Sequence, residues 1–261
     1  MKKISIFCCW NKEEILNSLL LPGLNRQKDV EFDLHLIYCG KGEGWKSAAQ
    51  VFNYHIDQAA SENLLFVHQD LELKEDSALA SVIEELEAKP KGIFGLVGAR
   101  AEGKTRQVFG NVYHGIMNVN SGCSISCVTS ADTLDECFVA MKKAVFMELK
   151  FDEINFDGWH FYAVDLCLRG KKKGFASYVL PLKSQHKNIL EMPGYLLHAG
   201  TYPKEFYHYA RVARRVHTGE YKRIVGSCCN YPTDLWGFYF SYYIPRVSKA
   251  KLRRFFRKIS F

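Results

Sequence analysis

The sequence predicts an α/β protein with a Rossmann-like, mostly parallel central sheet flanked by helices. Short apolar runs alternate with amphipathic stretches of helical length early in the chain, and glycines follow the second apolar run. This order is typical of parallel strands joined by crossover helices. The 261 residues are 48% hydrophobic, which suffices for a large core. We divide the chain into a domain at 1–200 and a helical, aromatic and basic extension at 201–261.

Individual elements follow from hydrophobic periodicity and from helix-breaking residues. We expect strands at 4–10, 32–38, 64–67, 92–99, 133–139 and 176–182, and helices at 12–21, 47–62, 76–88, 142–148 and 161–170. Pro22 and Gly23 should end the first helix. The run 64–67 is apolar throughout, as in a central parallel strand buried on both faces. From 102 to 130, Gly, Asn and Ser predict loops and short strands.

The net charge of +7 resides near the carboxyl end. No acidic residue follows Asp234, whereas seven basic residues do: Arg246, Lys249, Lys251, Arg253, Arg254, Arg257 and Lys258. The rest of the chain is balanced, which argues against a general affinity for nucleic acid. A helix from about residue 248 would have the composition of an interfacial helix on an anionic membrane. The alternatives are packing on its own domain or in a homodimer, and binding of an RNA-like polyanion.

No segment has the length of a signal sequence or of a membrane span. The first apolar run ends at Trp10, and no stretch of about 18 consecutive apolar residues occurs. We therefore expect a cytoplasmic protein, which the basic tail would hold peripherally at the inner face of the membrane. The nine cysteines lack zinc-ligand spacing, so we expect reduced thiols.

The polar triplet His68-Gln69-Asp70 comes directly after the most apolar predicted strand. In an open α/β sheet, ligands bind beyond the carboxyl ends of the central strands. A carboxylate there can bind a divalent cation, and the cation can neutralise the phosphates of a nucleoside diphosphate. For an isolated aspartate, the alternative is a cap on the turn into the next helix.

Several segments, taken in chain order, resemble one enzyme family. They are 47–53, 59–60, 66–73, 133–138, 142–146, 151–153 and 156–169. Together they resemble the inverting family 2 glycosyltransferases of the GT-A fold, over roughly residues 4–187. In those enzymes an apolar strand ends in an acidic D-x-D triplet. His68-Gln69-Asp70 is similar to the H-Q-D triplet of a bacterial subgroup.

The resemblance implies a metal site. Asp70 would be the direct ligand, His68 would contact the diphosphate or ribose, and Gln69 would be a spacer within the nucleotide-sugar site. His186 lies where many members place a histidine that completes the metal shell; a solvent-exposed loop histidine is the alternative. Because imidazole suits manganese better than magnesium, Mn²⁺ is the expected cofactor and Mg²⁺ the second choice.

The resemblance also implies a carboxylate base in an E-D pair at the start of the acceptor-side helix. The aligned residues here are Tyr162 and Ala163, so the usual base is missing. Asp165, the next acid on the helix, is our first candidate, followed by Asp135 and the adjacent Glu136. His160 could serve as a base or contact the acceptor. Core or surface roles are the alternatives for each.

On the nucleotide side, the family binds the base against the ends of the first two strands. Asn11 matches that place, whereas the second strand has no acid after it. Ser47 and Asn53 would touch the nucleotide side. Helix capping by Ser47 and a buried amide at Asn53 are equally good explanations.

The function implied by the resemblance is metal-dependent, inverting transfer of a sugar from a nucleotide-sugar donor. The acceptor would be a saccharide or a lipid-linked acceptor in bacterial surface glycan synthesis. A non-catalytic glycan- or nucleotide-binding module with a degenerate glycosyltransferase fold is the alternative that Ala163 favours. A nucleotidyltransferase fits less well, because Asn11-Lys12-Glu13 replaces a Gly-rich phosphate loop after the first strand.

Overall fold

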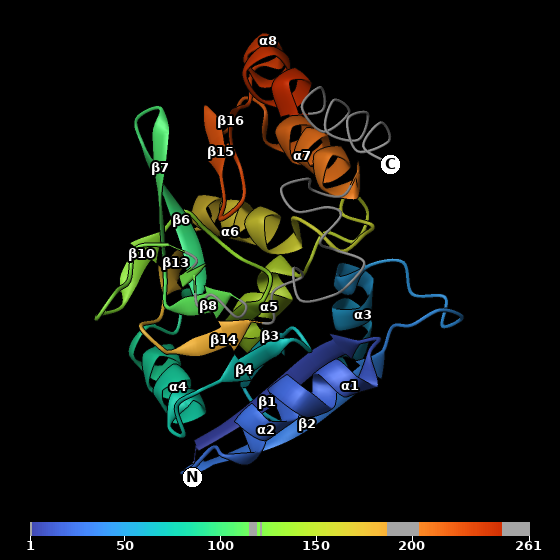
Figure 1. Ribbon diagram of the computed structural model, residues 1–261, viewed down its shortest axis with the longest axis vertical. Coiled ribbons are helices and arrows are strands. Elements are labelled where there is room, and N and C mark those ends of the chain that lie inside the picture. The colour runs from blue at the N-terminus through green and yellow to red at the C-terminus, as the bar shows by residue number, and fades with distance from the viewer. Residues whose placement is uncertain (1, 115–118, 121, 187–203, 247–261) are drawn as a thin grey trace, which may run out of the picture.

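A seven-stranded sheet forms the centre of the protein. The computed structural model of the protein describes residues 2–114, 119–120, 122–186 and 204–246. The strands of the sheet are β1 (Lys2–Trp10), β2 (Val30–Tyr38), β3 (Asn63–Val67), β5 (Gly92–Gly95), β10 (Thr129–Ala131), β12 (Phe138–Lys142) and β13 (Ala176–Val179). The spatial order is β10-β13-β5-β12-β3-β1-β2 (Figure 1). Only β12 and β10 run against the others. The predicted mostly parallel sheet is confirmed.

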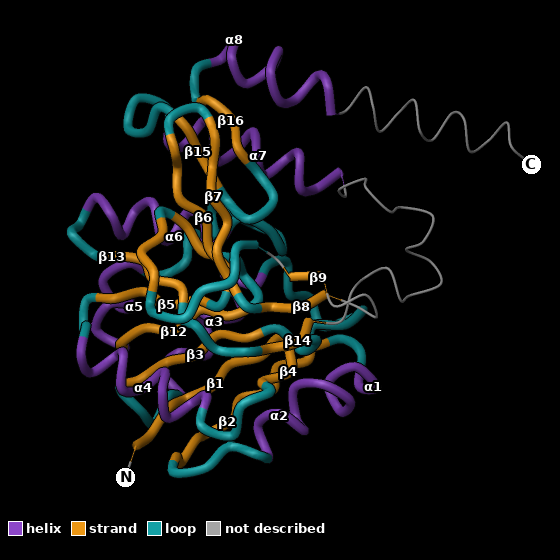
Figure 2. The backbone as a smooth tube through the Cα atoms, turned by 60° about the vertical axis from the view of Figure 1, so that its left-hand side comes forward, coloured by secondary structure: helices purple, strands orange, loops and turns teal. Residues whose placement is uncertain are grey.

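Helices cover both faces of this sheet (Figures 1 and 2). One face carries α1 (Glu13–Ile15), η1 (Leu16–Leu20), α2 (Leu21–Asn25) and α4 (Ala78–Ala88); the other carries α3 (Ala48–His55), η2 (Ile56–Gln58), α5 (Lys143–Leu149) and α6 (Tyr162–Lys172). Because side chains alternate along a strand, Ile6 and Cys8 of β1 join the first layer and Phe7 joins the second. The strand β3 is buried along its whole length, as its apolar sequence predicts.

Smaller sheets flank the central one. The first contains β4 (Leu71–Leu73), β14 (Ser184–His186), β8 (Val112–His114) and β9 (Val119–Asn120), and the second β11 (Thr133–Leu134), β6 (Val97–Glu102) and β7 (Thr105–Gly110). Two predicted strands are therefore wrong in extent. The strand expected at 92–99 divides between β5 and β6, and the one expected at 133–139 is interrupted by a turn at Asp135–Cys137.

Two predicted helix ends also differ from the structure. The first helix does not stop at Pro22. The π-helical turn η1 comes before Pro22, which lies in the first turn of α2. At that position the missing N–H of proline costs no helical hydrogen bond. Gly23 is needed there, since a Cβ would lie 2.8 Å from the backbone nitrogen of Leu73. The second helix ends at Gln58, because the N–H groups of Ala60 and Ser61 donate to Asp33 and Ser5 of the sheet.

The extension comprises α7 (Lys204–His217), the hairpin β15 (Arg223–Val225) and β16 (Asn230–Pro232), α8 (Leu235–Phe238) and η5 (Tyr239–Tyr243). It lies at the end of the molecule remote from β2 (Figure 1). Its buried side chains, including Phe206 and Ile224, belong to the same apolar cluster as α3, α5 and α6. The hairpin was not predicted, and the helix expected from 248 lies outside the described residues. None of the described helices is long and apolar enough to cross a bilayer.

Candidate nucleotide-sugar site

A pocket of about 340 Å³ opens at the carboxyl ends of β1 and β3, where ligands of open α/β sheets bind. Its wall is built from five parts of the chain: Cys9-Trp10-Asn11 at the end of β1, Cys39 after β2, Ala48 and Phe52 of α3, Val67-His68-Gln69-Asp70 at the end of β3, and Trp159, His160 and Tyr162 around the start of α6. Five predicted site residues, Asn11, His68, Gln69, Asp70 and His160, therefore meet in one place.

Gln69 joins the two loops that border the nucleotide side of the pocket. Its Oε1 accepts hydrogen bonds from the backbone N–H groups of Asn11 (3.1 Å) and Lys12 (3.0 Å), and its Nε2 donates to the side chain of Asn11 (2.8 Å). The residue is thus more than a spacer. It fixes the loop after β1 against the end of β3.

His68 and Asp70 bring an imidazole and a carboxylate to the same wall. The Nδ1 of His68 lies 3.9 Å from the Oδ1 of Asp70, and the Nε2 lies 3.3 Å from the hydroxyl of Tyr162. The backbone N–H of His68 donates to the carbonyl of Cys137, which continues the pairing of β3 with β12. Both side chains are partly exposed, so a ligand can reach them.

A left-handed residue shapes the start of α6. Phe161 has a φ of 71°, an unusual conformation for a bulky residue. Its N–H donates to the Oε1 of Glu136 (2.6 Å), and its ring packs against Phe206 of α7. With Phe161 buried in this way, both of its neighbours, His160 and Tyr162, line the pocket.

Two groups around the start of α6, Glu136 and His160, have shifted pKa values. Burial, reinforced by the charge of Asp135, raises the pKa of Glu136 to about 8, so this carboxyl holds its proton at neutral pH. Burial is also the main cause that lowers the pKa of His160; Glu205 and Asp135 oppose it, and His68 adds to it. His160 is therefore a neutral imidazole at neutral pH and can accept a proton.

Three other predicted residues have structural partners and do not line the pocket. Ser47 caps α3 by accepting a hydrogen bond from the N–H of Gln50 (3.0 Å). Asn53 ties α3 to the backbone of Phe151 in both directions. The carboxylate of Asp135 accepts hydrogen bonds from the hydroxyl of Ser227 (2.5 Å) and the N–H of Cys137 (3.1 Å).

Asp165, the first candidate for the base, lies in the core. It is fully buried, and its two oxygens lie 2.7 Å from the Nε of Arg169 and 3.0 Å from the Nε2 of His217. A carboxylate engaged in this way has no path to an acceptor hydroxyl. The expectation for Asp165 is therefore corrected: it pairs α6 with α7 and is absent from the pocket wall.

His186 can be placed only through its backbone. It is the last residue of β14 and pairs with Leu71, next to Asp70, on β4. Its side chain lies outside the described part of the structure, so its role as a metal ligand stays a prediction. Among the described residues, no group of three or more His, Cys, Asp or Glu side chains could by itself hold a metal ion.

Several pocket residues were missed from the sequence. Phe52 and Tyr162 are nearly fully buried and look like ordinary core residues in their helices. Trp159 has 37% of its surface exposed beside the pocket. The sequence could have indicated Trp159, since a tryptophan in a polar turn directly before a helix is seldom part of a core.

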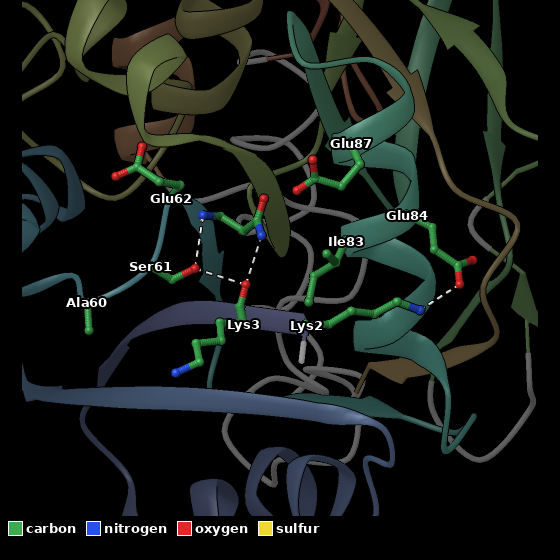
Figure 3. A pocket seen from close by; sticks show the side chains of 9 residues that line it. Lys2, Lys3, Ala60, Ser61, Glu62, Ile83, Glu84 and Glu87 are labelled. Carbon is green, nitrogen blue, oxygen red and sulfur yellow. Dashed lines mark hydrogen bonds and ion pairs between the residues drawn. The ribbon is translucent and has the colours of Figure 1, made fainter.

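A larger pocket, of about 790 Å³, lies at the opposite edge of the sheet, where β1 and β3 begin beside α4 (Figure 3). Its charged side chains are largely paired, as Lys2 with Glu84 at 2.6 Å, and Ser61 donates to the backbone carbonyl of Lys3. This is the amino edge of the parallel strands, so its size does not outweigh the chemistry at the carboxyl edge.

The fold and the pocket define a glycosyltransferase of the GT-A type. The chain belongs to the glycosyltransferase-like family, whose model matches residues 5–193. The predicted family, fold and enzyme class are thereby confirmed.

Two solved structures share the fold. GalNAc-T7, solved with UDP, GalNAc and Mn²⁺, has a TM-score of 0.56 and 10% identity over 81% of this chain and 48% of its own. Residues 1–349 of S. aureus TarS, solved with UDP-GlcNAc, have a TM-score of 0.50 and 15% identity over 85% of this chain and 68% of theirs.

A protein of Fuscovulum blasticum, described as ATP synthase subunits region ORF 6, is similar in sequence. It is 25% identical over 144 residues, which cover 52% of this chain and 56% of that protein. The match therefore spans about half the length of each protein.

Proposed function

We propose that the protein transfers a sugar from a nucleotide-sugar donor to a saccharide or lipid-linked acceptor, with inversion, in bacterial surface glycan synthesis at the inner face of the membrane. The observation that supports this best is the meeting of Asp70, His68 and His160 in one pocket at the carboxyl edge of the sheet. Asp70 and His68 could bind a diphosphate and its cation, and His160 could accept the proton of an acceptor hydroxyl.

The donor would lie along β1 and β3. The apolar wall formed by Cys9, Cys39 and Phe52 suits a nucleoside, and the diphosphate would lie beside His68 and Asp70. UDP-sugars are the first donors to test, because the two solved structures that share the fold contain UDP or a UDP-sugar.

A divalent cation fits the carboxylate at the end of β3. Asp70 would supply that carboxylate and His186, the other predicted ligand, an imidazole, while His68 would contact the diphosphate. Phosphate oxygens of the substrate and water would complete the shell, as at many nucleotide sites. The mixed nitrogen and oxygen ligands favour Mn²⁺. When bound, the cation neutralises the charge that develops on the leaving diphosphate.

His160 is the proposed base. The acceptor oxygen attacks the anomeric carbon, the bond from that carbon to the diphosphate breaks, and the hydroxyl proton passes to the neutral imidazole. Glu136 holds its own proton at neutral pH, and Asp135 is bonded to Ser227 outside the pocket wall. His160 lies on that wall, and its lowered pKa gives it the protonation state of a base at neutral pH.

Replacing His160 by glutamine should lower kcat by about 10²- to 10⁴-fold. Because the pKa of His160 is lowered, the wild-type rate should stay level through neutral pH and fall at a more acidic pH than an ordinary histidine would give, as the imidazole gains a proton. The variant should lose this acid limb. His55→Gln, a histidine of α3 outside the pocket, is the control; an unchanged acid limb in His160→Gln would contradict the assignment.

The transfer function itself is tested with a panel of UDP-, GDP- and CMP-sugars and MnCl₂, by following release of the nucleoside diphosphate or monophosphate. Release with at least one donor supports an enzyme. Binding of a donor without turnover would favour the non-catalytic module, a reading that Ala163 supports because a carboxylate is expected at that position.

A further inference from the structure

The helical segment α8–η5 has two apolar faces, and only one of them is packed. Phe238 and Tyr242 are buried against the domain. On the outer face Trp236 is 70% exposed and Phe240 64% exposed, and their rings stack at 5.8 Å. Leu235 (48%) and Ile244 (45%) are exposed next to them in sequence. One exposed apolar side chain is ordinary, but a group of four on one short segment indicates an interaction surface.

Basic side chains are exposed on the neighbouring helix α7. His208, Arg211 and Arg215 are exposed on α7 at helical spacing, behind a single exposed acid, Glu205. The guanidinium of Arg211 lies 5.3 Å from the ring of Tyr243, and that of Arg246 lies 4.1 Å from the ring of Tyr242. Both views place α7 beside α8 (Figures 1 and 2). Arg211 therefore lies where α7 meets η5, and Arg246 comes two residues after Ile244, so basic side chains border the segment that carries the exposed apolar ones.

We propose that this surface, formed by Leu235, Trp236, Phe240 and Ile244 with Arg211 and Arg215, docks the protein on an anionic lipid bilayer. Apolar side chains that enter the headgroup region and cations that attract acidic lipids are the two signals that stable peripheral binding needs. Aromatic residues such as Trp236 favour that boundary.

The charges favour lipid over a second copy of the chain. In a symmetric dimer the same patch would face itself, so Arg211 and Arg215 of both copies would be brought together. The sequence continues beyond Ile244 with seven basic residues and no acid, which makes self-pairing less favourable still. An acidic bilayer complements all of these charges.

The docking surface is also connected to the acceptor side of the pocket. On α7, Phe206 packs on Phe161, and the hydroxyl of Tyr209 donates to Asp157 (3.0 Å) in the loop that precedes His160. A surface on α7 and α8 would thus hold that loop near lipid. Binding to lipid needs no donor, so it can be tested apart from the proposed transfer reaction.

Sedimentation with vesicles tests the proposal on the full chain. We expect binding to vesicles of phosphatidylcholine with about one third phosphatidylglycerol, and much weaker binding to phosphatidylcholine alone or in high salt. Trp236→Ser with Phe240→Ser should weaken binding at least tenfold. Arg211→Glu with Arg215→Glu should weaken it by roughly fivefold for each charge removed, and more for each reversed.

Two variants serve as controls. Ile154→Ser changes a side chain that is 86% exposed on another loop and should bind like wild type. Trp236→Phe should retain most of the binding. Because all of these positions are exposed, circular dichroism should show unchanged folding.

Four results would overturn the proposal. The first is equal binding to neutral and acidic vesicles. The second is undiminished binding by the Trp236→Ser, Phe240→Ser protein. The third is a dimer in sedimentation equilibrium that this double variant abolishes, which would assign the surface to a second copy. Displacement of the protein from vesicles by polyuridylate at equal charge would likewise favour a polyanion over lipid.

Discussion

Replacing Asp70 by asparagine is expected to lower sugar transfer by about 10²- to 10³-fold while leaving the fold intact. Asp70 is the carboxylate at the end of β3 that lines the pocket, and its Oδ1 is 3.9 Å from His68. Asparagine keeps the shape of the side chain but removes the charge that attracts a divalent cation. The leaving diphosphate then departs without that cation, so kcat should fall, and the Mn²⁺-dependent part of donor binding should be lost with it.

Calorimetry of UDP, GDP and CMP binding, with and without Mn²⁺, separates this role from a structural one. In the wild type, Mn²⁺ should strengthen the binding of the preferred nucleotide. In Asp70→Asn the strengthening should vanish, while binding without metal stays similar. Asp76→Asn, a carboxylate that pairs with Lys28 outside the pocket, is the matched control. If Mn²⁺ still strengthens binding in Asp70→Asn, the cation is held elsewhere.

The sequence predicts this side of the pocket well, for a physical reason. A strand buried on both faces must be apolar throughout, so 64–67 was recognisable as the centre of the sheet, and the first polar residues after it had to lie at its carboxyl edge. His68, Gln69 and Asp70 follow directly from that reasoning. The sequence could not show that Gln69 holds the loop after β1, because its hydrogen-bond partner Asn11 lies 58 residues away in the chain.

The acceptor side was less predictable, because it depends on packing between distant segments. Asp165 lies on α6 only one turn after Tyr162, yet Tyr162 lines the pocket and Asp165 points to α7. Its partner His217 is 52 residues further along the chain, in an extension whose contacts no local pattern reveals. The left-handed turn at Phe161 also escaped prediction, since such a conformation is expected for glycine rather than phenylalanine.

Replacing Asp165 by alanine should destabilise the protein by about 3 kcal/mol or more. The change leaves His217, which is 1% exposed, without its Asp165 partner, and the Nδ1 of His217 is 3.6 Å from Glu220, too far for a good hydrogen bond. Arg169 retains the carbonyls of Leu149 and Lys150 as acceptors, which moderates the loss. In urea, the unfolding midpoint should fall by roughly 1 M.

Glu84→Ala is the control for this comparison, because Glu84 pairs with Lys2 at the surface with 65% of its side chain exposed. Such a pair contributes at most about 1 kcal/mol. A cycle of Asp165→Asn, His217→Gln and the double variant should give a coupling of about 0.5–3 kcal/mol. That coupling would show that the buried pair, and not either side chain alone, fastens α7 to α6.

Activity distinguishes this structural role from catalysis. Asp165→Asn should unfold more easily, yet below its unfolding transition it should retain most of the wild-type kcat, because the asparagine stays buried away from the pocket. A base would behave in the opposite way, with normal stability and a collapsed rate. The acceptor KM should rise in the same variant, since α7 supports the loop before His160 through Tyr209 and Phe206. Asp165 would then act on the reaction only by holding α7, and through it that loop, in place.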